Sequence, residues 1–207
     1  MIRISACATI RNYTVSRNGL DVLTLTGTDV ASFADDAYRA LNLQYPKYFK
    51  MDNLAKLGML ALEVLTQQQK LSERFASDAI GVVLANKSSS LDVDRRYFET
   101  TKQLASPALF VYTLANIVAG EMCIRHGIKG ENAFFVMPEF DPVQLHTYVE
   151  MVFGEAGAEA CVAGWVEVLG DQHDVFLYLA EIKAAENALP HTTDSITKLY
   201  RGQSWNN

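Results

Sequence analysis

Hydrophobic positions along the chain follow the spacing of strands in some segments and of helices in others. Residues 2–10 alternate apolar with polar side chains, which predicts a first strand, and Val22 to Leu25 can add a short second one. Residues 79–85 are continuously apolar, which is typical of a central strand covered on both faces. Three more apolar runs of strand length lie at 133–136, 160–168 and 175–182. The last two runs are joined by a hairpin-like connection.

Other stretches place apolar residues three and four positions apart, which predicts helices. Asp29 can cap a helix that extends to Leu41. Asp52 can cap a stronger one, because apolar and small residues recur at helical steps from Leu54 to Leu65.

Two further helices are predicted where a Ser-Pro and an Asp-Pro pair supply a cap and a first-turn proline. One covers 106–127, with Gly127 placed to close it, and the other begins at 141 and continues to 156. The tail from residue 186 is mostly polar, with one or two helical turns near Ile196 and Leu199. No repeat or linker divides the chain, so we expect one α/β domain over 1–207. Its sheet should be mixed and mainly parallel, with helices on its faces and the last two strands as an antiparallel edge.

The composition and a few local features argue against several classes of function. The chain has 207 residues, 49% hydrophobic and 20% charged, and a net charge of −6 without a basic run, which argues against nucleic-acid binding. Cys7, Cys123 and Cys161 are widely spaced in apolar stretches, so we expect buried thiols rather than disulfides or a zinc site. No signal peptide or membrane-spanning run is present, which favours a cytoplasmic protein. The polar loop 86–90 lacks the glycines of a phosphate-binding loop. We therefore expect no cofactor and no metal.

An ordered set of motifs resembles the β-ketoacyl-ACP synthases of fatty acid and polyketide biosynthesis. Ser106 to Phe110 and Thr113 to Asn116 resemble the family's Ser-Pro helix and its Leu-Pro-Asn element. Ile124 to Gly130 resembles the turn that precedes the strand leading to the nucleophile. Tyr48 to Asp52 resembles a Lys-Met-Asp helix start, and Ala160 to Glu167 a strand ending in Ala-Gly-Gly-x-Glu. The resemblance implies the thiolase fold, in which each half is a five-stranded mixed sheet flanked by helices. Whole condensing enzymes are about twice as long, so the chain resembles their N-terminal half alone.

The resemblance places Glu139 where the family has its nucleophilic cysteine, counting from Gly130. Condensation needs a thiolate there to hold an acyl chain as a thioester. A carboxylate is a poor nucleophile toward thioesters and would form a mixed anhydride. Glu139 and Asp141 also have a structural explanation, because acidic residues ahead of a helix satisfy free N–H groups and complement the helix dipole. The resemblance therefore gives no confident catalytic residue.

The histidines of this sequence do not match the catalytic histidines of the family, which lie in its second half. The four are His126, His146, His173 and His191. His191 begins a His-Thr-Thr that is only faintly similar to the family's His-Gly-Thr.

In the family, the strand before the nucleophile pairs with its counterpart in a second subunit. An apolar edge strand needs covering, so we expect dimerisation through Ala133, Phe134, Phe135, Val136 and Met137. The leading hypothesis is a non-catalytic subunit that pairs with itself or with a full-length ketosynthase, like a chain-length factor, or that binds an acyl carrier protein. One alternative is an acyl-thioester decarboxylase or hydrolase that uses Glu139. Another is a self-associating scaffold without a ligand.

Overall fold

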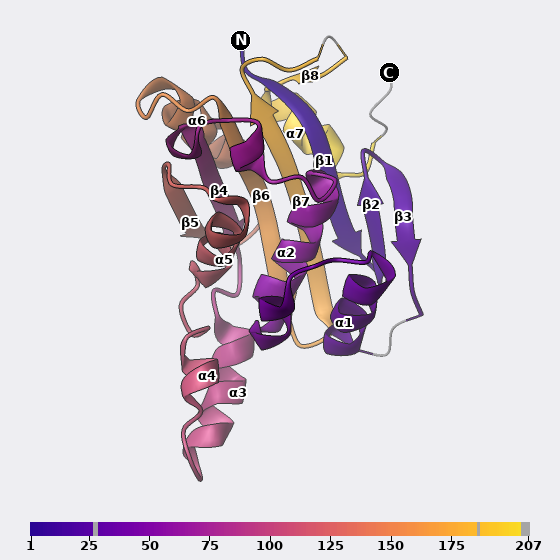
Figure 1. The fold of residues 1–207 in the computed structure, drawn as a ribbon, viewed down its shortest axis with the longest axis vertical. Coiled ribbons are helices and arrows are strands. Elements are labelled where there is room, and N and C mark those ends of the chain that lie inside the picture. The colour runs from indigo at the N-terminus through magenta and orange to yellow at the C-terminus, as the bar shows by residue number, and fades with distance from the viewer. Residues whose placement is uncertain (27–28, 186, 204–207) are drawn as a thin grey trace.

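The computed structural model describes residues 1–26, 29–185 and 187–203, and its centre is one mixed sheet (Figure 1). All five main strands expected from the apolar runs are present. They are β1 (Arg3–Arg11), β4 (Ile80–Asn86), β5 (Asn132–Val136), β6 (Ala160–Leu169) and β7 (Gln172–Glu181). Their order across the sheet is β1-β7-β6-β4-β5. β4 is parallel to β5 and β6, whereas β7 is antiparallel to both of its neighbours.

The sheet has eight strands, so the expected count of five was wrong. A hairpin of β2 (Thr14–Arg17) and β3 (Leu20–Thr24) extends the sheet beyond β1, and the two-residue β8 (Leu189–Pro190) also pairs with β1. The expected antiparallel edge was also wrong. β7 lies between β6 and β1, so the β6–β7 hairpin is in the middle of the sheet.

Helices cover both faces of the sheet. One face packs against α1 (Val30–Ala40), α2 (Asn53–Leu65) and α5 (Ile117–His126). The other packs against α6 (Pro142–Gly154) and α7 (Thr193–Tyr200), so the polar tail contains a full helix of its own. Three short 3₁₀ helices, at Pro46–Lys50, Leu71–Glu73 and Ser77–Ala79, complete the connections.

The segment from residue 106 to residue 127 is not the single long helix that we expected, because it divides into the one-turn α4 (Pro107–Phe110) and α5. A helix that we did not expect, α3 (Leu91–Thr101), precedes it. Only Val93 of α3 is buried, so this helix has no buried apolar stripe of the kind that predicted the other helices. The predicted caps are confirmed: Ser106 accepts a hydrogen bond from the Leu109 amide, and Gly127 ends α5 with φ +67°. The chain leaves helical geometry between them, at residues 111–116.

Helix α2 is the centre of the larger core. Every residue from Leu54 to Leu65 is buried, and Asp52 caps the helix by accepting a hydrogen bond from the Ala55 amide at 3.0 Å. Gly58 lets α5 approach closely, because a Cβ there would lie 2.6 Å from Cγ2 of Val118. Helix α2 thus joins the sheet to α5.

Candidate functional site

Strand β5 lies at the edge of the sheet, as the sequence predicted, and among the described strands it pairs with β4 alone. The Glu131 carbonyl accepts from Val82 N at 2.9 Å, and Met137 N donates to the Asn86 carbonyl at 2.8 Å. Backbone groups of alternate residues point to opposite sides of a strand. The N–H and C=O groups of residues 132, 134 and 136 therefore point away from the sheet. They form the edge available to another strand.

The side chains of β5 divide between the two faces of the sheet. Phe134 packs on the core under α2 and α5, whereas Phe135 packs on the α6 side and stacks on Tyr148 with ring centroids 4.0 Å apart. Val136 leaves 58% of its surface exposed. A hollow of about 470 Å³ lies between the β5 edge and α6, and Ala133, Phe135 and Tyr148 are among the residues that line it. The edge is therefore apolar and uncovered.

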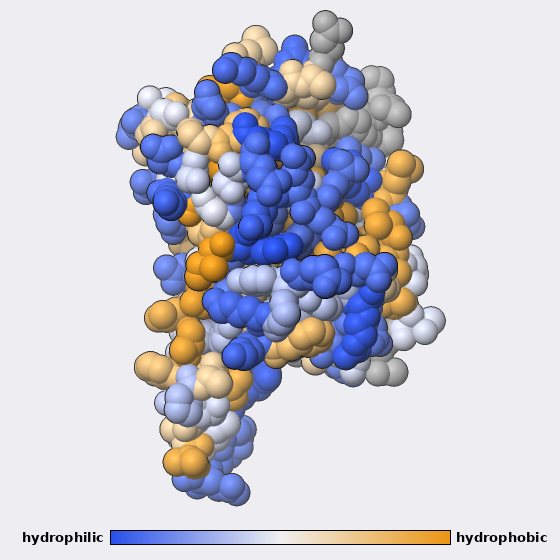
Figure 2. Space-filling model, in the orientation of Figure 1, coloured by the Kyte–Doolittle hydropathy of each residue, from blue (hydrophilic) through white to orange (hydrophobic). Residues whose placement is uncertain are grey.

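A helical arm projects from the body beside this edge. It consists of residues 91–114, which include α3 and α4, and Figure 1 shows it extending away from the sheet. Six of its large apolar side chains are exposed: Leu91, Phe98, Leu104, Phe110, Val111 and Leu114. Figure 2 shows hydrophobic residues on this arm and on the adjoining side of the body. Exposed apolar surface of this kind marks an interaction site. Of this arm, only the helix start at Ser106 was predicted from the sequence, and α3 was not.

Glu139 lies in the turn between β5 and α6, where the family resemblance places a cysteine. Its side chain is exposed and, within the described residues, has no hydrogen-bond or ion-pair partner. Asp141 is the residue that caps α6, accepting from the amides of Val143 and Gln144 at 2.9 and 3.0 Å. The structural explanation thus holds for Asp141, and Glu139 stands two residues before it.

None of the three cysteines lies in the turn between β5 and α6. Cys7 and Cys161 are buried in strands, and Cys123 is partly exposed on α5. Burial raises the pKa of Cys7 and of Cys123 to about 11, and it raises the pKa of Cys161 as well. These thiols are therefore protonated at neutral pH and are poor nucleophiles.

The four histidines divide into three environments. His126 is buried on α5, with Nε2 3.6 Å from Oε1 of Glu63, and His173 lies in the β6–β7 turn beside Tyr13. The rings of His146 and His191 stack with their centroids 4.8 Å apart. This pairing was not predicted from the sequence.

The fold is that of known ketosynthases and chain length factors. No protein-family model and no curated protein matches the sequence. Among solved structures, the chain is similar to the ishigamide ketosynthase/chain length factor, with TM-score 0.64 and 20% identity over 89% of this chain and 63% of that one.

Two further solved structures have the same fold. One is a ketosynthase in complex with its chain length factor from Xenorhabdus doucetiae, with TM-score 0.56 and 14% identity over 97% of this chain and 90% of that one. The other is a type II polyketide synthase acyl-carrier protein in complex with its ketosynthase, with TM-score 0.58 and 14% identity over 87% of this chain and 62% of that one. The chain thus spans less than two thirds of the first and third of these neighbours. At these identities the likeness establishes a ketosynthase-like, thiolase-type fold.

No helix among the described residues is long and apolar enough to cross a membrane.

Proposed function

We propose that this chain is a non-catalytic partner of a ketosynthase, comparable to a chain length factor. The observation that carries the proposal is the turn between β5 and α6. That turn presents an exposed glutamate, Glu139, where the sequence resemblance leads us to expect the nucleophile of a ketosynthase. A carboxylate there cannot hold an acyl chain as a thioester, and the three cysteines lie elsewhere in the fold. What remains is a folded scaffold with an uncovered face.

The extent of the structural likeness supports a partner role. The chain spans 90% of a chain from a complex between a ketosynthase and its chain length factor. A protein of this extent is therefore compatible with such an assembly. Another neighbour is bound to an acyl carrier protein, which makes a carrier protein a second expected partner.

The uncovered face supplies the contact surface. The edge of β5 offers backbone donors and acceptors at residues 132, 134 and 136, and the helical arm offers apolar side chains on the same side of the molecule (Figure 1). Addition of a partner strand would satisfy the edge groups. The arm would bury its apolar groups against the same partner.

The test is co-expression with a ketosynthase of the source organism, followed by size-exclusion chromatography and mass spectrometry. We expect one complex that contains both chains. Val136→Pro removes an outward N–H without touching the β4 hydrogen bonds, because proline is tolerated at a sheet edge. It should abolish co-elution, whereas the matched Val136→Thr should not.

A second pair of variants tests the arm. Leu104→Glu places a charge on the arm at a side chain that is 84% exposed, and Leu20→Glu makes the same change on β3, where the side chain is 75% exposed. We expect Leu104→Glu to release the ketosynthase and Leu20→Glu to retain it. Co-elution that survives both Val136→Pro and Leu104→Glu, with the variants folded by circular dichroism, would contradict the proposed face. Repeated absence of any complex with the wild-type chain would contradict the partner role itself.

A further inference from the structure

Three side chains on the α6 side of the sheet form a cluster that the sequence did not predict. His146 and Glu150 lie one turn apart on α6, so they share a face of that helix. His191 follows β8, and its backbone N–H donates to the Ile2 carbonyl at 3.2 Å. The chain thus brings a residue from position 191 against a helix some forty residues earlier. One nitrogen of each ring and one carboxylate oxygen all lie within 4.8 Å of one another.

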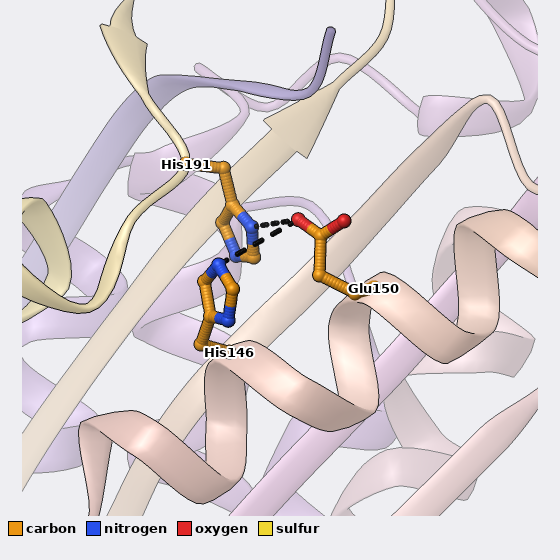
Figure 3. Close-up of side chains that lie close together, drawn as sticks. All are labelled: His146, Glu150 and His191. Atoms are coloured by element: carbon orange, nitrogen blue, oxygen red, sulfur yellow. Dashed lines mark hydrogen bonds and ion pairs between the residues drawn. The ribbon is translucent and has the colours of Figure 1, made fainter.

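Both imidazoles converge on the same oxygen. Oε1 of Glu150 is 2.9 Å from Nδ1 of His191 and 3.7 Å from Nε2 of His146, and Figure 3 shows both nitrogens directed at it. The two rings stack at an interplanar angle of 12°. A hydrogen bond explains the His191–Glu150 contact alone. The longer His146 contact is an i,i+4 pair on α6, and it brings a second imidazole nitrogen to the same oxygen.

His191 is held from behind by a buried tyrosine. Its Nε2 lies 3.3 Å from the Tyr178 hydroxyl, which belongs to β7. Burial raises the pKa of Tyr178 well above its ordinary value, so the hydroxyl keeps its proton. A hydroxyl can either donate or accept. Without an ion, Nδ1–H of His191 can donate to Glu150 at 2.9 Å; with an ion bound to Nδ1, the proton would lie on Nε2 and could be donated to the Tyr178 hydroxyl. Metal-binding histidines commonly donate their other ring N–H to such an outer partner.

One residue of the cluster is buried, and the other two are partly exposed on the side that is open to solvent. The His191 side chain is fully buried, whereas those of His146 and Glu150 are 30% and 45% exposed. The open side gives an ion access from solvent, and the exposed ligands can adjust around it.

We propose that His146, Glu150 and His191 form a binding site for a Zn²⁺ ion. Two imidazole nitrogens and one carboxylate are a donor set that suits zinc, unlike the all-oxygen sets of Ca²⁺ and Mg²⁺. Zinc–ligand distances of about 2.0–2.2 Å require donor atoms roughly 3.4 Å apart around a tetrahedral ion. The two contacts of Glu150 Oε1, at 2.9 and 3.7 Å, lie on either side of this value, and the third separation is at most 4.8 Å, so small movements of the partly exposed His146 and Glu150 would bring the three donor atoms to it. Water supplies the remaining ligand from the open side.

Among the described residues, this is the one possible metal-binding cluster, and it links α6 to the segment between β8 and α7. His191 lies between β8 and α7, so an ion bound to α6 fastens the C-terminal segment to the body. The inference is independent of the proposed partner role, because the cluster includes neither the β5 edge nor the arm.

The experiment is a zinc titration of the full chain, freed of any affinity tag and treated with a chelator. Calorimetry with ZnCl₂ should give one equivalent bound. Thermal unfolding should shift upward by roughly 5–10 °C when zinc is present at about 100 times its Kd. Co²⁺ in place of zinc should give the visible absorption bands of a four- or five-coordinate nitrogen–oxygen site.

Variants separate this site from incidental zinc binding. His146→Ala and Glu150→Gln change partly exposed positions on a helix, so both should fold, and each should weaken zinc binding at least about tenfold and remove the Co²⁺ bands. His173→Ala, in the β6–β7 turn, is the matched control and should bind zinc as the wild type does. Absence of one-equivalent binding by the wild type would overturn the proposal. So would binding that His146→Ala and Glu150→Gln leave unchanged, or a loss that His173→Ala reproduces.

Discussion

The carboxyl group of Asp52 gives the structure its most testable dependence on pH. It caps the central helix α2, is only 2% exposed, and has one oxygen, Oδ2, without a hydrogen-bond partner in the described structure. Burial raises its pKa from 3.8 to about 6, although the bonds from the backbone amides of Ala55 and Leu54 oppose the shift. The charged form is therefore disfavoured in the folded state. The perturbation that removes it is Asp52→Asn, which keeps a capping oxygen and cannot ionise.

The sign and the size follow from the two pKa values. Below the pKa of the unfolded chain, Asp52 is protonated in both states, so it does not make the free energy of unfolding depend on pH. Between 3.8 and about 6 the unfolded chain loses this proton while the folded chain retains it, so stability falls as pH rises through this window. The whole shift corresponds to about 3 kcal/mol, and about 2 kcal/mol of it falls between pH 4 and pH 7.5. Relative to wild type, Asp52→Asn should gain that amount over this range.

Urea denaturation at half-unit steps from pH 4 to pH 7.5 measures the difference directly, since the other titrating groups cancel between variant and wild type. Asp141→Asn is the matched control, because it makes the same change at the cap of α6, where the side chain is half-exposed. A free-energy difference between Asp52→Asn and wild type that stays constant across the range would refute the reasoning, since Asp52 would then titrate alike in both states.

Three other outcomes follow from packing and burial, all measurable by urea denaturation or thiol labelling. Gly164→Ala should cost at least about 3 kcal/mol, because a Cβ there would lie 2.0 Å from the Phe176 carbonyl oxygen, whereas Gly154→Ala, with open space around it, should cost nothing. Arg125→Ala should cost about 3–5 kcal/mol, because it leaves Glu63 buried without its 2.5 Å partner, and a loss under 1 kcal/mol would contradict this. In the folded protein a disulfide reagent at pH 8 should label Cys7 and Cys161 far more slowly than in urea, and equal rates would contradict the burial of these two thiols.

The sequence predicted the parts of the fold that depend on local patterning. The buried run at β4 and the caps at Asp52 and Asp141 are confirmed, because each depends on residues that are neighbours in the chain. The position of β7 inside the sheet depends instead on its pairing with β1, some 170 residues away, and no local pattern records that pairing. Helix α3 was not predicted for a related reason, because it projects from the body and buries only Val93.

In the candidate sites, too, local features could be predicted from the sequence and contacts between distant segments could not. The edge position of β5 was predicted from the family resemblance and agrees with the sheet order, whereas its use in dimerisation stays a prediction. The spacing of His146 and Glu150 was visible as one helical turn, but nothing near either residue pointed to His191. A cluster assembled from distant segments becomes visible only once the chain is folded.

The residues that carry the family resemblance have structural tasks in this chain. Asp52 caps α2 and Ser106 caps α4, while Gly127 ends α5 in the left-handed conformation. Gly130 has to be glycine because a Cβ would lie 2.5 Å from the Ile80 carbonyl oxygen. Each of these requirements comes from the backbone path, and none involves a reacting atom. A chain that no longer condenses acyl groups would still need them in order to fold. The resemblance can therefore persist at the helix ends and close contacts whether or not the turn before α6 carries a nucleophile.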